Sequence, residues 1–380
     1  MTPKRDPVRL DAATGLSESM ARPIAGTGMR ADARTPGTAV ARASAASRPV
    51  RTRFLIAVGG FGALACLTCV LAPLVGSTHI NLLRAFDRSI PFADNVDAQI
   101  FFVARLPRVL SGALVGAALA AAGVIFQAML RNPLATPFTL GVSAGSSLGA
   151  MLAIIFGASM AIGPLSPVPL ASLVGASLAA AIVYWLAAPQ GRAMSTSVLL
   201  LAGVTLNSFF SALIMFVQYI ADFSQVYRAA RWLMGDLDVG GFGPILAVLP
   251  LLAIALVIFA VLPSSLNLLS VGTDAAAARG VNVPRVQRLA FISASLATSA
   301  AVSLAGPIGF VGIVVPHLVR LMVGVDHRIV LPASALFGAA FLVACDLIAR
   351  TLFAPVEIPV GVVTAMLGGP FFLWLLVRRG

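Results

Sequence analysis

Asp346 and Arg350 are the ionisable residues that most clearly interrupt an apolar stretch of this chain. They lie four positions apart, so on a helix they share one face, one turn from each other. A carboxylate inside a membrane-spanning segment can carry a proton or an ion, and such residues often belong to a functional site. The alternative is an ion pair at a helix end, with an arginine that extends toward the membrane surface. A driven carrier would place several such groups near mid-membrane, and this chain has few, so its energy is expected to come from a partner.

The residue patterns of common catalytic sites are absent from the sequence. Lys4 is the one lysine in the chain, which excludes a phosphate-binding loop of the G-x-x-x-x-G-K type. The three histidines are far apart and lack the spacing of metal ligands. Cys66 and Cys69 form a C-x-x-C within an apolar run, where a redox thiolate would not be accessible. We therefore expect no enzyme activity, no metal site and no bound cofactor on this chain.

The composition is that of an integral membrane protein. Of the 380 residues, 59% are hydrophobic and 11% are charged, whereas soluble domains average about 25% charged residues. The apolar runs are rich in small residues, which favours a tightly packed helical bundle. We expect an all-α fold of ten transmembrane helices, each near 20 residues. They are predicted near 54–75, 109–130, 139–160, 169–188, 198–220, 244–263, 289–305, 308–323, 331–350 and 360–377.

Two features set the predicted topology. The uncharged stretch 289–318 is too long for one span, and Gly306-Pro307 is the natural break within it. Residues 1–53 hold ten Lys and Arg against four acids, and basic residues before a first span favour a cytoplasmic N-terminus. With ten spans the C-terminus is then cytoplasmic too.

The first 50 residues form a separate region. They are rich in Ala, Arg, Thr, Ser, Gly and Pro without an apolar period, which predicts a disordered, Arg-rich cytoplasmic tail. Residues 51–380 are then the ten-span domain. The net charge of +12 could suggest nucleic acid, but no aromatic residue is interleaved with the basic residues to stack on bases. We expect no nucleic-acid partner.

Six sequence blocks, in order from Arg105 onward, resemble one family. The chain is similar to the FecCD-type membrane permeases of ABC importers for iron-siderophores, haem and vitamin B12. The first block, RLPRVLSGALVGAALAAAGVIFQAMLRNPLATPFTLGVSAGSSLGA, spans 105–150. The blocks continue with LLLAGVTLNSF (199–209), RWLMGDL (231–237), GPIGFVGIVVPHLVRLMVGVDHR (306–328), LPASALFGAAFLVACDLIART (331–351) and EIPVGVVTAMLGGPFFLWLL (357–376).

The resemblance implies type II ABC importer architecture and roles for particular residues. Arg105, Arg108 and Arg350 match arginines that dock the periplasmic binding protein through its acidic residues. The cytoplasmic loop 264–288 matches the segment that docks the ATPase. The coupling residues within it are Gly272, Thr273, Asp274, Ala275, Ala278, Arg279, Gly280 and Val281.

Two further sets of positions match the permeation pathway of the family. The cytoplasmic gate positions are Asn132 and Leu134, with Thr196 and Ser197 on an opposing loop. The alternative for the first pair is a stiff turn set by its neighbouring prolines. The pathway-lining positions on the fifth span are Asn207, Ser208, Ser211 and Gln218, and their alternative role is hydrogen bonding between helices. Asp236 and Cys345 depart from the residues that the family usually has at those positions.

The expected function is that of a non-catalytic permease subunit in the bacterial inner membrane, surrounded by lipid. It would pass an iron chelate, a siderophore complex or haem, into the cytoplasm. The alternatives are a vitamin B12 permease and an ion-coupled secondary transporter. The expected partners are a second copy of the chain, two ABC ATPase subunits that hold ATP and Mg, and a periplasmic binding protein that delivers the chelate.

Overall fold

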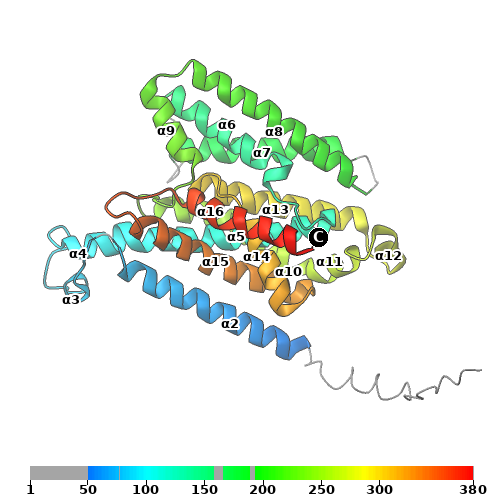
Figure 1. The fold of residues 1–380 in the computed structure, drawn as a ribbon, viewed down its shortest axis with the longest axis horizontal. Helices are drawn as coiled ribbons and strands as arrows, with labels where there is room; N and C mark the ends of the chain where they lie inside the picture. Colours follow the sequence, from blue (N-terminus) through cyan, green and yellow to red (C-terminus); the bar gives the residue numbers. More distant parts are fainter. Residues whose placement is uncertain (1–49, 77, 158–165, 189–192, 380) are drawn as a thin grey trace, which may run out of the picture. The chain divides into compact units, whose positions relative to one another are not determined.

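The computed structural model describes residues 50–379 apart from 77, 158–165 and 189–192, and the regular elements in these ranges are helices (Figure 1). The predicted tail lies outside the described residues except for Val50, the first residue of α2. The helices that coincide with predicted spans are α2 (Val50–Leu71), α5 (Leu106–Leu130), α6 (Val142–Ile155), α7 (Pro167–Ala187), α8 (Thr196–Tyr219), α10 (Gly243–Val261), α13 (Val283–Ala305), α14 (Val311–Val323), α15 (His327–Thr351) and α16 (Val360–Arg379).

Shorter helices connect these elements. They are η1 (Ala72–Leu74), α3 (Leu82–Ala85), α4 (Val96–Gln99), η2 (Ile100–Arg105), η3 (Phe138–Leu140), α9 (Phe223–Leu233), α11 (Pro263–Leu269) and α12 (Thr273–Ala278).

The helices at the ten predicted spans differ in whether they are long enough to cross a membrane. In the described part of the chain, seven helical stretches are long and apolar enough to cross a membrane. The helices α6, α14 and the apolar part of α16 are shorter, at 10–17 residues. At 1.5 Å per residue, the 14 residues of α6 span about 21 Å, less than the ~30 Å hydrocarbon core. A multi-pass helical membrane protein is therefore established, while the count of ten spans stays a prediction.

The helix α5 lies at the centre of the bundle and packs against α13, α14 and α15. Its contacts are close because glycines face each other where the backbones cross. A side chain at Gly116 would meet the carbonyl of Gly338 on α15, and one at Gly123 would meet the carbonyl of Gly312 on α14. Small residues at such crossings let apolar helices approach closely, and dispersion contacts between them stabilise the bundle.

The helices α6, α7 and α8 form a second group. Gly145 and Gly149 on α6 face Gly175 on α7 at close backbone approach. The Ser146 and Ser172 hydroxyls form a hydrogen bond of 2.5 Å between the same two helices. The helix α8 packs on α6, α7 and η3, and Gly203 allows it to approach the backbone of Leu140. One side of α8 is thereby covered.

The predicted break within 289–318 is confirmed. The helix α13 ends at Ala305 and α14 begins at Val311. Gly306 has a positive φ of 68°, and a side chain there would meet the carbonyl of Trp232 in the last turn of α9. The turn is thus both a chain reversal and a packing site.

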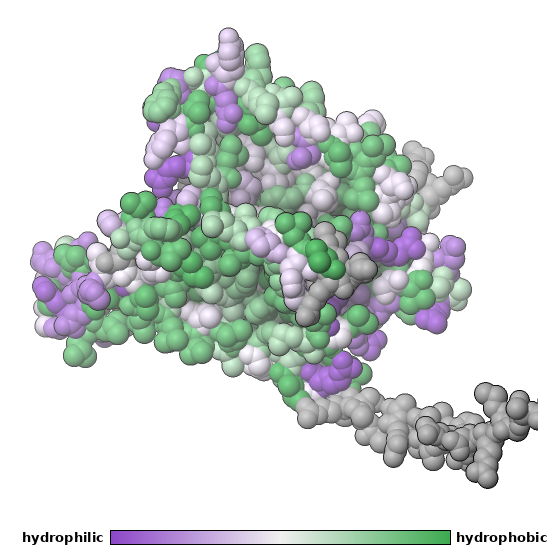
Figure 2. Space-filling model, in the orientation of Figure 1, coloured by the Kyte–Doolittle hydropathy of each residue, from purple (hydrophilic) through white to green (hydrophobic). Residues whose placement is uncertain are grey.

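The surface of the bundle is hydrophobic between two polar ends. Figure 2 shows hydrophilic residues gathered at α3–α4 and at α11–α12, with a mainly hydrophobic surface between them. Exposed side chains of this surface include Leu67 on α2, Leu201 on α8 and Val257 on α10. Exposed apolar surface of this extent is stable in lipid, since water would not solvate it favourably.

Candidate functional site

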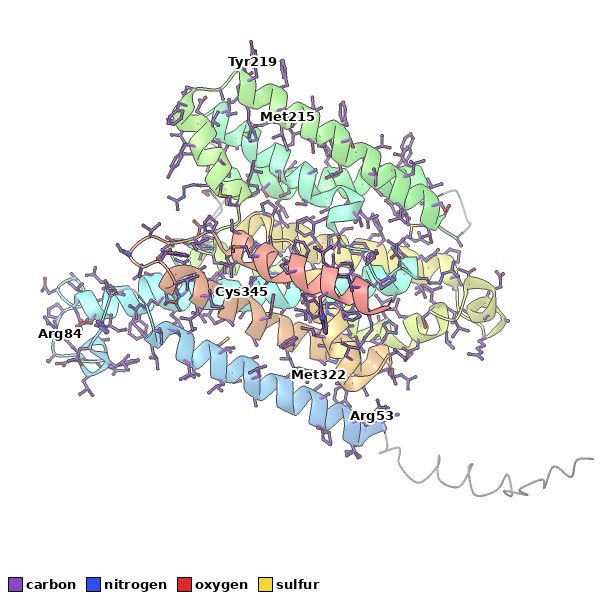
Figure 3. All side chains as sticks on the ribbon, in the orientation of Figure 1. Arg53, Arg84, Met215, Tyr219, Met322 and Cys345 are labelled. Atoms are coloured by element: carbon purple, nitrogen blue, oxygen red, sulfur yellow. The ribbon has the colours of Figure 1, made fainter. Side chains whose placement is uncertain are left out.

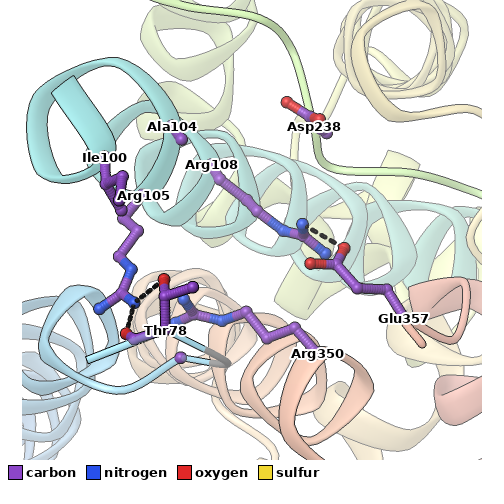
Figure 4. Close-up of a pocket in the computed structure, with 9 residues that line it drawn as sticks. Thr78, Ile100, Ala104, Arg105, Arg108, Asp238, Arg350 and Glu357 are labelled. Atoms are coloured by element: carbon purple, nitrogen blue, oxygen red, sulfur yellow. Dashed lines mark hydrogen bonds and ion pairs between the residues drawn. The ribbon is translucent and has the colours of Figure 1, made fainter. Parts of the chain in front are cut away.

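One cavity of about 210 Å³ is lined by three arginines, Arg105, Arg108 and Arg350 (Figure 4). The first and the last of them are 245 positions apart in the sequence. The first two come from the η2–α5 junction and the third from the end of α15. The helix η2 is a π-helix, a widened turn that is frequent at functional sites. The structure therefore brings together all three arginines that the sequence analysis assigned to docking.

The Arg108 side chain binds two carboxylates, Glu357 in the cavity wall and the buried Asp346. Its Nε donates a hydrogen bond of 2.9 Å to Asp346 Oδ1, and its Nη1 donates one of 2.7 Å to Glu357 Oε2. The Asp346 side chain is 2% exposed, whereas that of Glu357 is 48% exposed. Arg108 thus connects a buried carboxylate to one at the surface.

Asp346 also forms the helix-end ion pair expected from its spacing with Arg350. The Arg350 Nε lies 3.6 Å from Asp346 Oδ2, and its Nη2 donates to the backbone carbonyl of Ala72. A lone buried carboxylate would be costly, and the two guanidinium groups offset that cost. Because Asp346 also binds Arg108, the Asp346–Arg350 pair is part of a larger cluster of charged side chains.

Arg105 is held by backbone carbonyls. Its side chain donates to the carbonyl of Pro73 at 3.0 Å and to the carbonyl and hydroxyl of Thr78. Gly76 lies against the guanidinium, and a side chain at that position would collide with it. Arg105 and Arg350 are 6% and 4% exposed, so their charges line the cavity from within the fold. Docking through these arginines stays a prediction.

The sequence analysis missed Glu357 and paired Asp346 with Arg350 alone. A signal for Glu357 was present, since it is the only glutamate in residues 51–380 and stands directly before the last span. No local signal pairs Arg108 with Asp346, because 238 positions separate them.

Two further cavities adjoin this cluster at α9. One, of about 500 Å³, is lined by Arg108, Glu357 and Arg231 among others, and another, of about 410 Å³, by Arg231 and Asp236. Arg231 Nη2 lies 3.5 Å from Asp236 Oδ2, and both side chains are well exposed. Asp236, the departure from the family pattern, is therefore the ion-pair partner of an exposed arginine at this surface.

The helix α9 begins at a capping box. The Asp222 carboxylate accepts from the backbone N–H of Gln225, and the Gln225 side chain accepts from the backbone N–H of Asp222. The backbone hydrogen bond from Gln225 and the hydroxyl of Ser224 lower the pKa of Asp222 below its ordinary value. These bonds fix where α9 begins, and they thereby help to position Arg231 in the last turn of that helix.

The predicted coupling segment contains the helix α12, which ends at Ala278, two residues before Gly280. Gly280 has a φ of 82°, its N–H donates to the carbonyl of Ala277, and the N–H of Val281 donates to that of Ala276. This pair of bonds is a Schellman motif, which requires the left-handed conformation that glycine adopts readily.

One alanine of the coupling helix points inward. Ala276, which lies between the predicted coupling residues Ala275 and Ala278, is fully buried against the bundle. It anchors the helix and is not available to a partner. The coupling residues themselves are exposed or half-buried: Gly272, Thr273, Asp274, Ala275, Ala278, Arg279, Gly280 and Val281.

The two predicted gate pairs have different local structures. Asn132 Oδ1 accepts from the backbone N–H of Leu134 at 2.9 Å, so the turn after α5 is rigid, and Leu134 is 45% exposed. Thr196 and Ser197 were predicted in a loop, which is wrong: they are the first two residues of α8. Ser195 caps this helix by accepting from the N–H of Val198, which starts it two residues earlier than expected.

The predicted pathway residues lie on the uncovered side of α8. Asn207 and Ser208 are exposed, and Ser211 and Gln218 are half-buried. Met215 and Tyr219 on the same helix point away from the bundle (Figure 3) and are 70% and 87% exposed. A helix face that mixes polar and large apolar side chains fits protein contact or a water-filled passage better than lipid alone.

Comparison with known proteins relates this geometry to a family. A model of the FecCD transport family matches residues 64–378. The hemin transport system permease protein of Yersinia pestis is 38% identical over 327 residues, which are 84% of this chain and 95% of that protein. The cobalamin import system permease protein of Halobacterium salinarum is 43% identical over 299 residues, or 78% and 79% of the two chains.

Two further matches are also to membrane transport proteins. The Fe(3+) dicitrate transport system permease protein FecD of Escherichia coli is 39% identical over 274 residues, which are 72% of this chain and 84% of that protein. A solved structure, described as an inward-facing conformation of a metal-chelate type ABC transporter, is similar with a TM-score of 0.71. It is 32% identical, and the match covers 86% of this chain and 99% of that one.

Proposed function

The chain belongs to the FecCD transport family, and we propose that it is the permease subunit of an ABC importer that carries an iron chelate into the cytoplasm. ATP hydrolysed by partner subunits drives the transport. The chain itself supplies the pathway and the docking surfaces, without catalysis. The protein resides in the bacterial inner membrane, with both termini on the cytoplasmic side.

The observation that supports the proposal is that the arginine cluster and the α11–α12 segment contact opposite ends of one long helix, α15. His327 lies at the start of α15, and Asp346, which belongs to the arginine cluster, lies 19 residues further along the same helix. At 1.5 Å per residue, the two positions are about 28 Å apart along the helix axis. The α11–α12 segment contacts the His327 end. A binding protein outside and an ATPase inside would need docking surfaces separated in this way.

Each end suits the partner proposed for it. Outside, the cavity lined by Arg105, Arg108 and Arg350 would receive acidic residues of a binding protein, with the exposed Arg231 at the adjoining cavity. Charged surfaces of opposite sign speed association. Inside, the exposed small residues of α12 allow close approach of an ATPase groove. ATP and Mg would be held by that ATPase.

The open face of α8 supports a homodimer around a central pathway. Asn207, Ser208, Ser211 and Gln218 would line it, while the turn with Asn132 and Leu134 and the start of α8 close its inner end. The alternating opening of the outer and inner gates is rigid-body switching driven by the ATPases.

An iron chelate is the proposed substrate because relatives are named for hemin and for ferric citrate. Vitamin B12 is the alternative, supported by the cobalamin import relative. The binding protein would select among these, since the lining positions carry no charge that distinguishes one chelate from another.

Reconstitution in proteoliposomes tests the proposal. The permease, its ATPase and its binding protein should take up a ferric siderophore, haem or cobalamin only with ATP inside, and a non-hydrolysable ATP analogue should block uptake. The absorption spectrum of the ligand that the binding protein retains would identify the chelate. Uptake driven by a proton or sodium gradient without the ATPase would refute the proposal in favour of a secondary transporter.

A further inference from the structure

Asn267 on α11 is hydrogen-bonded through both ends of its side-chain amide to the start of α15, about 60 positions away. Its Nδ2 donates to Asp326 Oδ1 at 2.6 Å. Its Oδ1 accepts from the backbone N–H of His327 at 2.8 Å and lies 2.7 Å from His327 Nδ1. An amide oxygen can only accept, so Nδ1 carries the proton in this contact.

The partners of Asn267 are the residues that begin α15. Asp326 is the N-cap of this helix, and its Oδ1 accepts from the backbone N–H of Arg328 at 3.0 Å. His327, the first helical residue, is 6% exposed. Directional hydrogen bonds therefore set the position of α11 against this helix end more strictly than apolar packing would.

The helix α11 is firmly connected to the coupling helix α12. Only Ser270 to Gly272 separate the two, and the N–H of Gly272 donates to the carbonyl of Leu269. Leu266, Leu269 and Ala276 are fully buried in the same apolar core. Because the connection is short and both helices are anchored, a displacement of α12 must also displace α11.

The helix α15 extends from this junction to the outer arginine cluster. It runs without interruption from His327 to Thr351, with Pro332 in its second turn, and Asp346 near its far end binds Arg108. Along the way Gly338 holds it against α5 at backbone contact. One helix thus has the Asn267 junction at one end and the docking cavity at the other.

We propose that Asn267 is the positioning residue that couples the ATPase surface to the binding-protein surface. A shift of α12 is passed by the Asn267 amide to the cap of α15, and α15 alters the Asp346–Arg108 contact at its other end. The inference rests on the proposed function, since it assumes that partners dock at both ends. Coupling between two binding sites is reciprocal, so each partner changes the affinity of the other by the same factor.

The test uses the complete importer in lipid nanodiscs. The dissociation constant of the binding protein is measured with and without a non-hydrolysable ATP analogue, and the ratio of the two values reports the coupling. Asn267→Ala should move this ratio toward 1 by about fivefold or more, the lower end of typical coupling factors. The complex should still assemble, because the side-chain hydrogen bonds of Asn267 are made to the start of α15 and leave the exposed coupling residues of α12 intact.

A matched control lies one turn away on the same segment. Ser270 Oγ donates to the backbone carbonyl of Asn267 at 2.8 Å, so Ser270→Ala removes one hydrogen bond from α11 without touching α15. This variant should keep the wild-type ratio. An unchanged ratio in Asn267→Ala, or an equal loss in both variants, would overturn the proposal.

An exchange of donor and acceptor separates coupling from a loss of folding. Asn267→Asp places a carboxylate against Asp326 and should lose the coupling by repulsion. Combining it with Asp326→Asn supplies an amide donor from the other side and should recover at least half of the lost coupling. A double variant no better than the single one would contradict the role of this bond. A wild-type importer without ATP-driven uptake would instead refute the proposed function itself.

Discussion

The two carboxylates bound to Arg108 should differ sharply in what they contribute to stability. Asp346 and Glu357 accept hydrogen bonds of 2.9 and 2.7 Å from the same guanidinium, but their side chains are 2% and 48% exposed. The isosteric changes Asp346→Asn and Glu357→Gln remove one negative charge each and keep an amide oxygen as acceptor. Their comparison therefore isolates the effect of burial on an ion pair.

The expected magnitudes follow from solvent screening. Removing one partner of a buried pair costs about 3–5 kcal/mol, and we expect about 3 kcal/mol for Asp346→Asn because Arg108 keeps a hydrogen bond. An exposed pair contributes about 1 kcal/mol or less, which we expect for Glu357→Gln. A large domain loses about 2 °C of thermal midpoint per kcal/mol. The midpoint should therefore fall by about 6 °C in Asp346→Asn and by at most about 2 °C in Glu357→Gln.

The assay is thermal unfolding of the purified protein in one detergent, followed by the fluorescence of a thiol- or tryptophan-based probe. The double variant leaves Arg108 without a carboxylate, so its loss should exceed the sum of the single losses. Equal shifts for the two single variants, or additive behaviour of the double variant, would show that burial does not govern this cluster.

Further changes test other parts of the structure. Gly116→Ala should disrupt the α5–α15 crossing and lower the yield of folded protein in detergent, whereas Gly59→Ala, with open space around it, should not. Gly280→Ala should cost about 1 kcal/mol because of the φ of 82°, and should loosen α12, measured as a lower binding-protein-stimulated ATPase rate. Glu357→Gln should tighten binding of the binding protein at low salt, since it removes the exposed negative charge beside Arg108, and weaker binding would count against docking there. Deletion of residues 1–45 should leave transport unchanged in a properly inserted protein.

Local patterns predicted much of the helical framework. The Gly306-Pro307 break and the end of α12 before Gly280 depend on backbone preferences of neighbouring residues, and both are found in the structure. The start of α8 was placed too late because the capping role of Ser195 was overlooked. The lengths of α6 and α14 differ from those expected because long apolar runs do not show where tertiary packing ends a helix.

The sequence by itself determined that this protein is a multi-pass helical membrane protein of one family, because hydropathy, small-residue content and ordered motifs are readable along the chain. It also identified Arg105, Arg108 and Arg350 as a related set. Tertiary structure alone decided that Arg108 joins Asp346 to Glu357 and that Asn267 holds the start of α15. These contacts join residues 59 to 249 positions apart, and burial decides their strength. Neither the partner nor the burial of such a side chain is set by its neighbours in sequence.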